Sequence, residues 1–155
     1  MKPNLDQLLP CLRAEMPDIL AGGPAMLAYL YGSVVDGCAL PFSDVDIALV
    51  LEPGYSLSAY ERMLLELDIA SEVERRCGAQ KVDVRSVDLA PLTVRGKVVT
   101  EGRLLYSRDE TFRVEFEVYT RKLYFDFLPV AHMMQRAYFD HMGAALRRQG
   151  VLAGD

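Results

Sequence analysis

Residues 26–51 decide the fold, and they read MLAYLYGSVVDGCALPFSDVDIALVL. Residues 26–31 are apolar and end at Gly32, a pattern that predicts a buried strand. After a polar loop that contains glycine, residues 44–47 alternate between acidic and apolar side chains, and the chain is then wholly apolar through Leu51. This second pattern predicts a strand with one end exposed to solvent and the other end buried.

The sequence on either side of this stretch predicts further helices. Apolar residues at helical spacing predict an amphipathic helix over residues 4–16, with Pro17 beyond its end. Residues 57–77 predict the clearest helix, and Gly78 stands where a helix C-terminus favours glycine. The apolar face of this second helix is predicted to carry Leu57, Tyr60, Leu64, Leu67 and Val73.

The remainder of the chain predicts strands over residues 81–87 and 103–107, a short helix over 89–100 and a long helical tail over 112–148. Strands separated by helices predict an α+β fold of the α/β type, in which a small mixed sheet is flanked by helices. The length of 155 residues fits one domain over 1–155, with a core over about 22–108 and the tail over about 109–149. The tail is rich in aromatic residues, which serve either the core or a partner surface.

Composition and charge exclude several classes of protein. A formal net charge of -5 argues against direct binding of nucleic acid, and the apolar runs are too short to span a membrane. The opening residues 1–6 lack the apolar segment of a secretory signal. The chain has three cysteines, Cys11, Cys38 and Cys77, which are widely separated and form no C-x-x-C pair. This odd number and spacing predict reduced packing residues in a cytoplasmic protein.

Three aspartates form the candidate catalytic group. Residues i and i+2 of a strand point to the same side, so Asp44 and Asp46 present two carboxylates in one direction. Asp83 completes the group if the strand over 81–87 is a neighbour in the sheet. Like charges at such short range repel each other unless a cation lies between them, and oxygen ligands favour a hard ion such as Mg²⁺. We therefore predict that all three aspartates bind metal and take part in catalysis.

Gly32 and Ser33 are the predicted nucleotide-binding residues. A glycine at a strand end lets a phosphate approach the backbone, and a following helical turn directs free N–H groups at the anion. The Ser33 hydroxyl adds another donor. Basic side chains that could meet phosphate charge are Lys81, Arg85 and Arg95, which the sequence does not rank.

Ten residues separate the pair Gly32-Ser33 from the motif Asp44-x-Asp46. This spacing resembles the signature of the DNA polymerase β-like nucleotidyltransferase superfamily. The short length and the third aspartate, Asp83, are similar to its minimal branch. The tail, with Phe116-Glu117 followed by Tyr124-Phe125-Asp126-Phe127-x-Pro129, looks like that of MntA-type antitoxins.

This resemblance implies the polymerase β-like fold, ATP as substrate and two Mg²⁺ ions held by the three aspartates. It also implies transfer of AMP to a tyrosine hydroxyl of a HEPN-domain ribonuclease toxin of the HepT type. Asp83 would then help to deprotonate the incoming hydroxyl. Two alternatives remain open: transfer to a small-molecule hydroxyl such as that of an aminoglycoside, and neutralisation of a toxin by binding alone.

Overall fold

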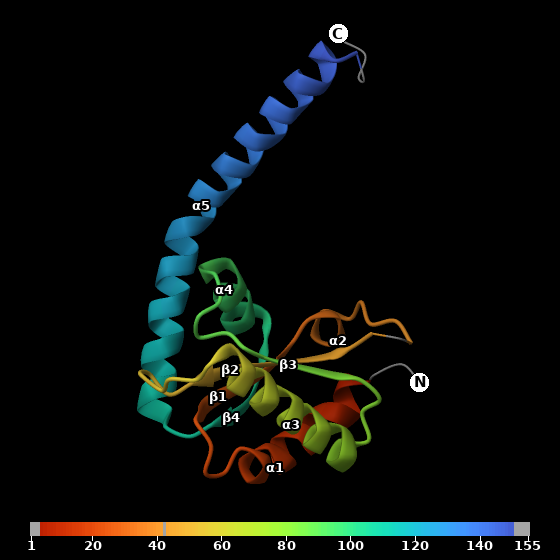
Figure 1. Ribbon diagram of the computed structural model, residues 1–155, viewed down its shortest axis with the longest axis vertical. Helices are drawn as coiled ribbons and strands as arrows, with labels where there is room; N and C mark the ends of the chain where they lie inside the picture. The colour runs from red at the N-terminus through yellow and green to blue at the C-terminus, as the bar shows by residue number, and fades with distance from the viewer. Residues whose placement is uncertain (1–3, 42, 151–155) are drawn as a thin grey trace. The chain divides into compact units, whose positions relative to one another are not determined.

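The computed structural model describes residues 4–41 and 43–150, so the ends of the predicted domain at 1–3 and 151–155 lie outside the described residues. The elements follow one another along the chain as Figure 1 shows. In order they are α1 (Leu5–Ile19), β1 (Ala25–Tyr31), α2 (Ser33–Asp36), β2 (Val45–Leu51), α3 (Ala59–Cys77), β3 (Val82–Ser86), α4 (Leu92–Glu101), β4 (Arg103–Ser107) and α5 (Glu110–Arg148).

The four strands form one mixed sheet in the order β3-β2-β1-β4. β1 is antiparallel to both β2 and β4, whereas β2 and β3 run parallel. The connection between these two parallel strands is α3, as expected for a crossover. This arrangement confirms the predicted fold class of a small mixed sheet with flanking helices.

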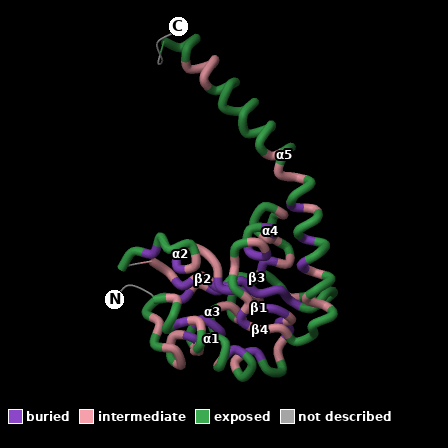
Figure 2. The backbone as a smooth tube through the Cα atoms, turned by 180° about the vertical axis from the view of Figure 1, so that it is seen from behind, coloured by how far each residue is buried: buried purple, intermediate pink, exposed green. Residues whose placement is uncertain are grey.

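One face of the sheet packs against α1 and α3. The side chains of Ile47 and Leu49 on β2 are fully buried there, and Leu12 and Met16 of α1 cover them together with Val73 of α3. Figure 2 shows the buried residues of the strands in purple. Because successive strand residues point to opposite faces, Asp44, Asp46 and Asp83 do not face this core.

The opposite face is covered by α4 and by the first turns of α5. Leu27 and Tyr29 of β1 and Val50 of β2 pack there with Val98, and Phe116 lies against them. The Tyr29 hydroxyl donates a hydrogen bond of 2.9 Å to Glu117 Oε1. Other members of this cluster are Ala48, Val87, Leu104 and Phe112. The aspartates therefore lie at the open end of a face whose remainder is a hydrophobic core.

The ends of α3 follow helix-capping chemistry. Ser58 and Glu61 form a capping box at the N-terminus, and Gly78 ends the helix in the left-handed conformation. The predicted apolar face was wrong for Tyr60, Leu64 and Leu67, which are exposed, whereas Val73 is buried as predicted and Leu57 packs against the core. The helix buries Ile69 and Ala70 together with Val73, since this side is the one that meets the sheet and α1.

Two other local predictions need correction. α1 continues through Pro17 to Ile19, because burial of Leu12 and Met16 holds the last turn on the sheet and outweighs the one N–H that proline lacks. Part of the predicted loop after Gly32 is helical, since residues 33–36 form the single turn α2.

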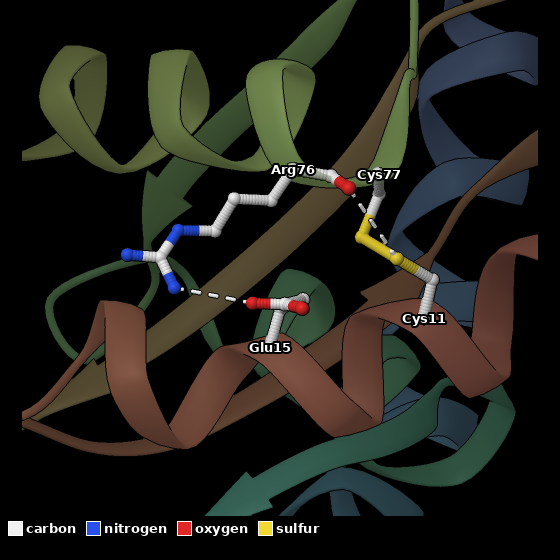
Figure 3. The surroundings of a disulfide bond; sticks show 4 residues. All are labelled: Cys11, Glu15, Arg76 and Cys77. Carbon is white, nitrogen blue, oxygen red and sulfur yellow. Dashed lines mark hydrogen bonds and ion pairs between the residues drawn. A yellow bond between two sulfur atoms is a disulfide. The ribbon is translucent and has the colours of Figure 1, made fainter.

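The prediction that all three cysteines are reduced was wrong for two of them. Cys11 of α1 and Cys77 of α3 form a disulfide, with their Cα atoms 5.9 Å apart, whereas Cys38 is free and exposed. Figure 3 shows the disulfide beside the ion pair of Arg76 with Glu15, so the two helices are joined twice over a short distance. Because the cysteines are paired, they no longer argue for a cytoplasmic location.

α5 begins in one compact unit, Met1–Arg121, and continues in a second, Lys122–Asp155. In the first unit Glu117 is buried. Its carboxylate accepts hydrogen bonds from Tyr29 and Arg113 and forms an ion pair with Arg121. In the second unit most large apolar side chains are exposed, as the green later turns of the helix in Figure 2 show. Those from Val130 onward are Val130, Met133, Met134, Tyr138, Phe139 and Met142. Across the described residues, no helix is long and apolar enough to cross a membrane.

Candidate active site

The parallel pairing of β2 with β3 brings the three aspartates together. Asp46 lies directly beside Asp83 in the register, and Asp44 precedes Asp46 by two residues on the same side. One carboxylate oxygen from each of the three lies within 4.8 Å of the other two. All three residues are partly buried, so their carboxylates remain open to a ligand.

The electrostatics of this carboxylate cluster favour a bound cation. Burial raises the pKa of the Asp46 carboxyl above its ordinary value, and the charges of Asp83 and Asp44 raise the same pKa further. Arg85 lowers it and offsets part of this effect. Three clustered carboxylates supply only hard oxygen ligands, so the donor set fits Mg²⁺ or a similar ion.

Gly32 brings the backbone of β1 against the carboxylate cluster. Its φ is 82° and its ψ is -158°, a combination that only glycine adopts readily, and a Cβ at this position would overlap the carboxylate of Asp46. The Gly32 carbonyl accepts hydrogen bonds of 3.1 Å from the N–H groups of Val35 and Asp36. The N–H groups of Ser33 and Val34 open this turn, where helix geometry leaves backbone donors without intrahelical partners.

Two basic residues of the β3 segment contact the cluster, and both were among the three candidates that the sequence named without ranking them. Lys81 Nζ lies 3.1 Å from Asp44 Oδ1, and Arg85 Nε lies 3.2 Å from Asp83 Oδ2. Their positions two residues before and after Asp83 were the available signal, because alternation puts all three on one side of the strand. Arg95, the third basic candidate, has a buried Nε with no hydrogen-bond partner among the described residues.

Tyr31 is a further residue that sequence reasoning missed. It pairs with Asp46 across β1 and β2. Burial raises the pKa of its phenol above the ordinary value, and the charges of Asp46 and Asp83 add to this rise. Its place directly before Gly32 was the only hint in the sequence. Tyr31 thus forms a neutral wall of the site on the β1 side.

A separate cavity of about 810 Å³ lies at the other end of β2. Its walls include Leu51 at the end of the strand, Tyr55 after it, and Phe112, Phe116 and Tyr119 from the start of α5. None of the clustered aspartates lines it, so the cavity and the carboxylate cluster are distinct features of the same unit.

Comparison with known proteins identifies relatives of this fold. The family model described as polymerase beta, nucleotidyltransferase matches residues 21–111, which include Gly32, Ser33 and the three aspartates. No curated protein sequence matches.

Several solved structures share the fold at low sequence identity. A toxin–antitoxin protein crystallised with AMP-PNP is 23% identical, with a TM-score of 0.61 over 84% of this chain and 97% of that one. An MntA–HepT toxin–antitoxin chain is 22% identical, with a TM-score of 0.57 over 84% of this chain and 96% of that one. A chain of the Shewanella oneidensis complex of tri-AMPylated HEPN toxin with MNT antitoxin is 21% identical, with a TM-score of 0.58 over 86% and 98% of the two chains.

Proposed function

The chain belongs to the polymerase beta nucleotidyltransferase family, and from this premise we propose that it is an antitoxin that transfers AMP from ATP to a tyrosine hydroxyl of a HEPN-type ribonuclease toxin. The observation that carries the proposal is the cluster of Asp44, Asp46 and Asp83 beside the Gly32 turn. The similar solved structures support the choice of nucleotide and partner, since they include a toxin–antitoxin protein with AMP-PNP and an AMPylated HEPN toxin.

Asp44, Asp46 and Asp83 would hold Mg²⁺, for which we expect two ions. Bound there, the metal neutralises charge on the triphosphate and polarises the phosphorus that is attacked. The raised pKa of Asp46 fits this role, because a cation relieves the repulsion that its neighbours impose. The turn at Gly32 and Ser33 would hold phosphate oxygens through backbone N–H groups.

In the proposed reaction the oxygen of the acceptor hydroxyl forms a bond to the α phosphorus of ATP. The bond from this phosphorus to the bridging oxygen breaks on the opposite side, and pyrophosphate leaves. Asp83 accepts the hydroxyl proton, for which its position on β3 beside Asp46 is suitable. Positioning and charge neutralisation supply most of the rate acceleration, as is general in reactions of this type.

The exposed apolar side chains of the second unit support a protein acceptor rather than a small one. A contiguous apolar surface marks an interface with another protein. Residues 122–150 supply such a surface through Met134 and Tyr138, whose exposed fractions are 61% and 57%. We place the action of the protein in the cytoplasm, where ATP and the RNA cleaved by a ribonuclease toxin are found.

The proposal is tested by incubating the protein with a co-expressed HEPN toxin, Mg²⁺ and ATP labelled at the α phosphate. We expect label on a toxin tyrosine, located by mass spectrometry. Because charge neutralisation at the metal contributes several kcal/mol, Asp44→Asn and Asp46→Asn should each reduce labelling at least about 100-fold. Asp68→Asn, on the exposed side of α3, is the matched control and should label normally.

Three outcomes separate this proposal from its alternatives. Normal labelling by the Asp44→Asn, Asp46→Asn double variant would show that the proposed mechanism is wrong. If the double variant still neutralises the toxin in cells without labelling it, the protein acts by binding alone. Label on an aminoglycoside, with none on the toxin, would identify a small-molecule acceptor.

A further inference from the structure

Two of the three clustered carboxylates already have a cation beside them. Lys81 contacts Asp44 at 3.1 Å and Arg85 contacts Asp83 at 3.2 Å, whereas no ion pair to Asp46 forms among the described residues. Both basic side chains come from the β3 segment and flank Asp83 on the same side of the strand. They therefore stand at the place where the proposed function requires metal ions.

These ion pairs are weakly held in comparison with others in the same unit. The Lys81 and Arg85 side chains are 72% and 68% exposed, and each contacts a single carboxylate group of the cluster. Arg76, in contrast, is 24% exposed and contacts Glu15, Asp18 and Glu72 together. Exposed ion pairs contribute only about 0–1 kcal/mol to stability, so Lys81 and Arg85 can leave their carboxylates at little cost.

We propose that Lys81 and Arg85 are displaceable counter-ions of the carboxylate cluster. Without divalent metal they neutralise Asp44 and Asp83, and when metal and nucleoside triphosphate bind together they transfer their ionic contacts to phosphate oxygens. No covalent bond changes in this step. The inference rests on the proposed function, and it assigns the basic residues that meet the triphosphate.

The exchange couples the binding of metal to the binding of nucleotide. Metal alone must displace two cations that then have no anionic partner, whereas metal with a triphosphate offers them new partners. Each ligand should therefore strengthen the binding of the other, and the coupling must be reciprocal. Removing both basic side chains should tighten the binding of metal alone and weaken the binding of nucleotide in the presence of metal.

The test uses the full chain as Lys81→Met, Arg85→Gln and the double variant, with Mn²⁺ and a non-hydrolysable ATP analogue as probes. Free Mn²⁺ is measured by electron paramagnetic resonance with and without the analogue. For the double variant we expect Mn²⁺ alone to bind at least about 5-fold tighter, and the analogue at saturating Mn²⁺ to bind at least about 5-fold weaker. Arg75→Gln is the matched control, because Arg75 is 66% exposed and pairs with Glu72 on α3.

The two opposite changes distinguish counter-ion exchange from a merely structural role, which would move neither affinity. If the double variant binds Mn²⁺ no tighter than the Arg75→Gln control, or keeps the affinity of the wild type for the analogue, the inference is overturned. The single variants should each show part of both changes, which guards against a folding defect of the double variant. A wild-type protein that binds neither probe would overturn the proposed function itself, whereas normal wild-type binding with unresponsive variants refutes only the counter-ion role.

Discussion

At the scale of single residues, Asp46 combines burial with two acidic neighbours. Its folded-state pKa is raised above the unfolded value, first by burial and then by the charges of Asp83 and Asp44. A raised pKa means that the ionised carboxylate lowers the stability of the folded state at every pH above that pKa. Protonation at acidic pH, or a bound cation at neutral pH, removes this penalty. The metal-free site is therefore a local source of instability, as is common for functional sites.

Asp46→Asn should stabilise the metal-free protein at neutral pH. Removing a like-charge pair between adjacent strands is expected to raise the free energy of unfolding by about 0.5–1 kcal/mol. The gain should shrink as the pH falls through the raised pKa of Asp46, because the wild-type carboxyl then becomes neutral too. Thermal unfolding in EDTA at pH 7.5 and at pH 4.5 measures both effects.

The control for this prediction is Asp68→Asn, which removes an exposed carboxylate on α3. We expect its melting temperature to stay close to that of the wild type at both pH values. A destabilised Asp46→Asn protein at pH 7.5 in EDTA would contradict the electrostatic account of the site. Added Mg²⁺ should stabilise the wild type more than the variant, since the variant lacks one metal ligand.

Gly32→Ala should damage the site more than the fold. Its backbone lies at φ 82° and ψ -158°, and the new Cβ would overlap the Asp46 carboxylate. Backbone strain of this kind costs about 1–3 kcal/mol, and displacement of Asp46 should also reduce Mn²⁺ affinity. Gly54→Ala is the matched control, because Gly54 has φ 79° and nothing within 4 Å of an added Cβ. If both variants bind Mn²⁺ equally well, Gly32 does not shape the metal site.

The sequence predicted the residues of the site better than their contacts. Alternation along the strands placed Asp44 and Asp46 on one side, and this needed no tertiary information. The meeting of Asp46 with Asp83 depended on β3 pairing with β2, which the sequence suggested only through the connecting helix. The contact of Lys81 with Asp44 depended on the reach of a side chain from the β3 segment to the β2 segment, which periodicity does not encode, whereas Arg85 contacts Asp83 two residues away on β3 itself. The catalytic roles of these residues stay predictions.

At the scale of elements, α1 and α3 show where local patterns lose their predictive power. Tyr60, Leu64 and Leu67 repeat at helical spacing and yet are exposed, and of the predicted face only Val73 is fully buried, together with Ile69 and Ala70. A helix with two apolar sides buries the one that its neighbours cover, and no local rule identifies that side. The disulfide escaped prediction for the same reason, because its cysteines are 66 residues apart and meet only through helix packing.

Reduction of the Cys11–Cys77 disulfide should destabilise the first unit. A bond that closes a loop of 66 residues restricts the unfolded chain, so its loss is expected to lower the free energy of unfolding by about 3–4 kcal/mol. Urea unfolding with and without a reducing agent measures the change. The double variant Cys11→Ala, Cys77→Ala should unfold like the reduced wild type and show no response to reductant.

Cys38→Ala provides the matched control for reduction, since Cys38 is free and exposed. It should retain the full difference between oxidised and reduced protein. Equal stability of the oxidised and reduced wild type would mean that packing between α1 and α3, together with the pairs of Arg76 to Glu15 and Asp18, already fixes these helices.

At the scale of the whole molecule, α5 has two different environments along its length. In the first unit, Phe112 and Phe116 pack on the sheet, and buried Glu117 bonds to Tyr29. In the second unit, an exposed stripe recurs every four residues, at Val130, Met134, Tyr138 and Met142. The aromatic tail thus serves the core in its first turns, whereas residues 122–150 carry far more exposed apolar surface than a solvated helix needs.

Met134→Lys should weaken association with the toxin without affecting the nucleotide site. A charge placed within an apolar stripe must be desolvated in the complex, so we expect at least about a tenfold loss of affinity. His132→Lys is the matched control, because His132 is exposed on the other side of the same helix. Titration of labelled toxin measures the loss, while binding of the ATP analogue should stay unchanged, because the carboxylate cluster lies in the first unit. Equal toxin affinity of the two variants would show that the stripe does not contact the toxin. If the wild type is a dimer and Met134→Lys alone is a monomer, the stripe binds a second copy of this chain instead.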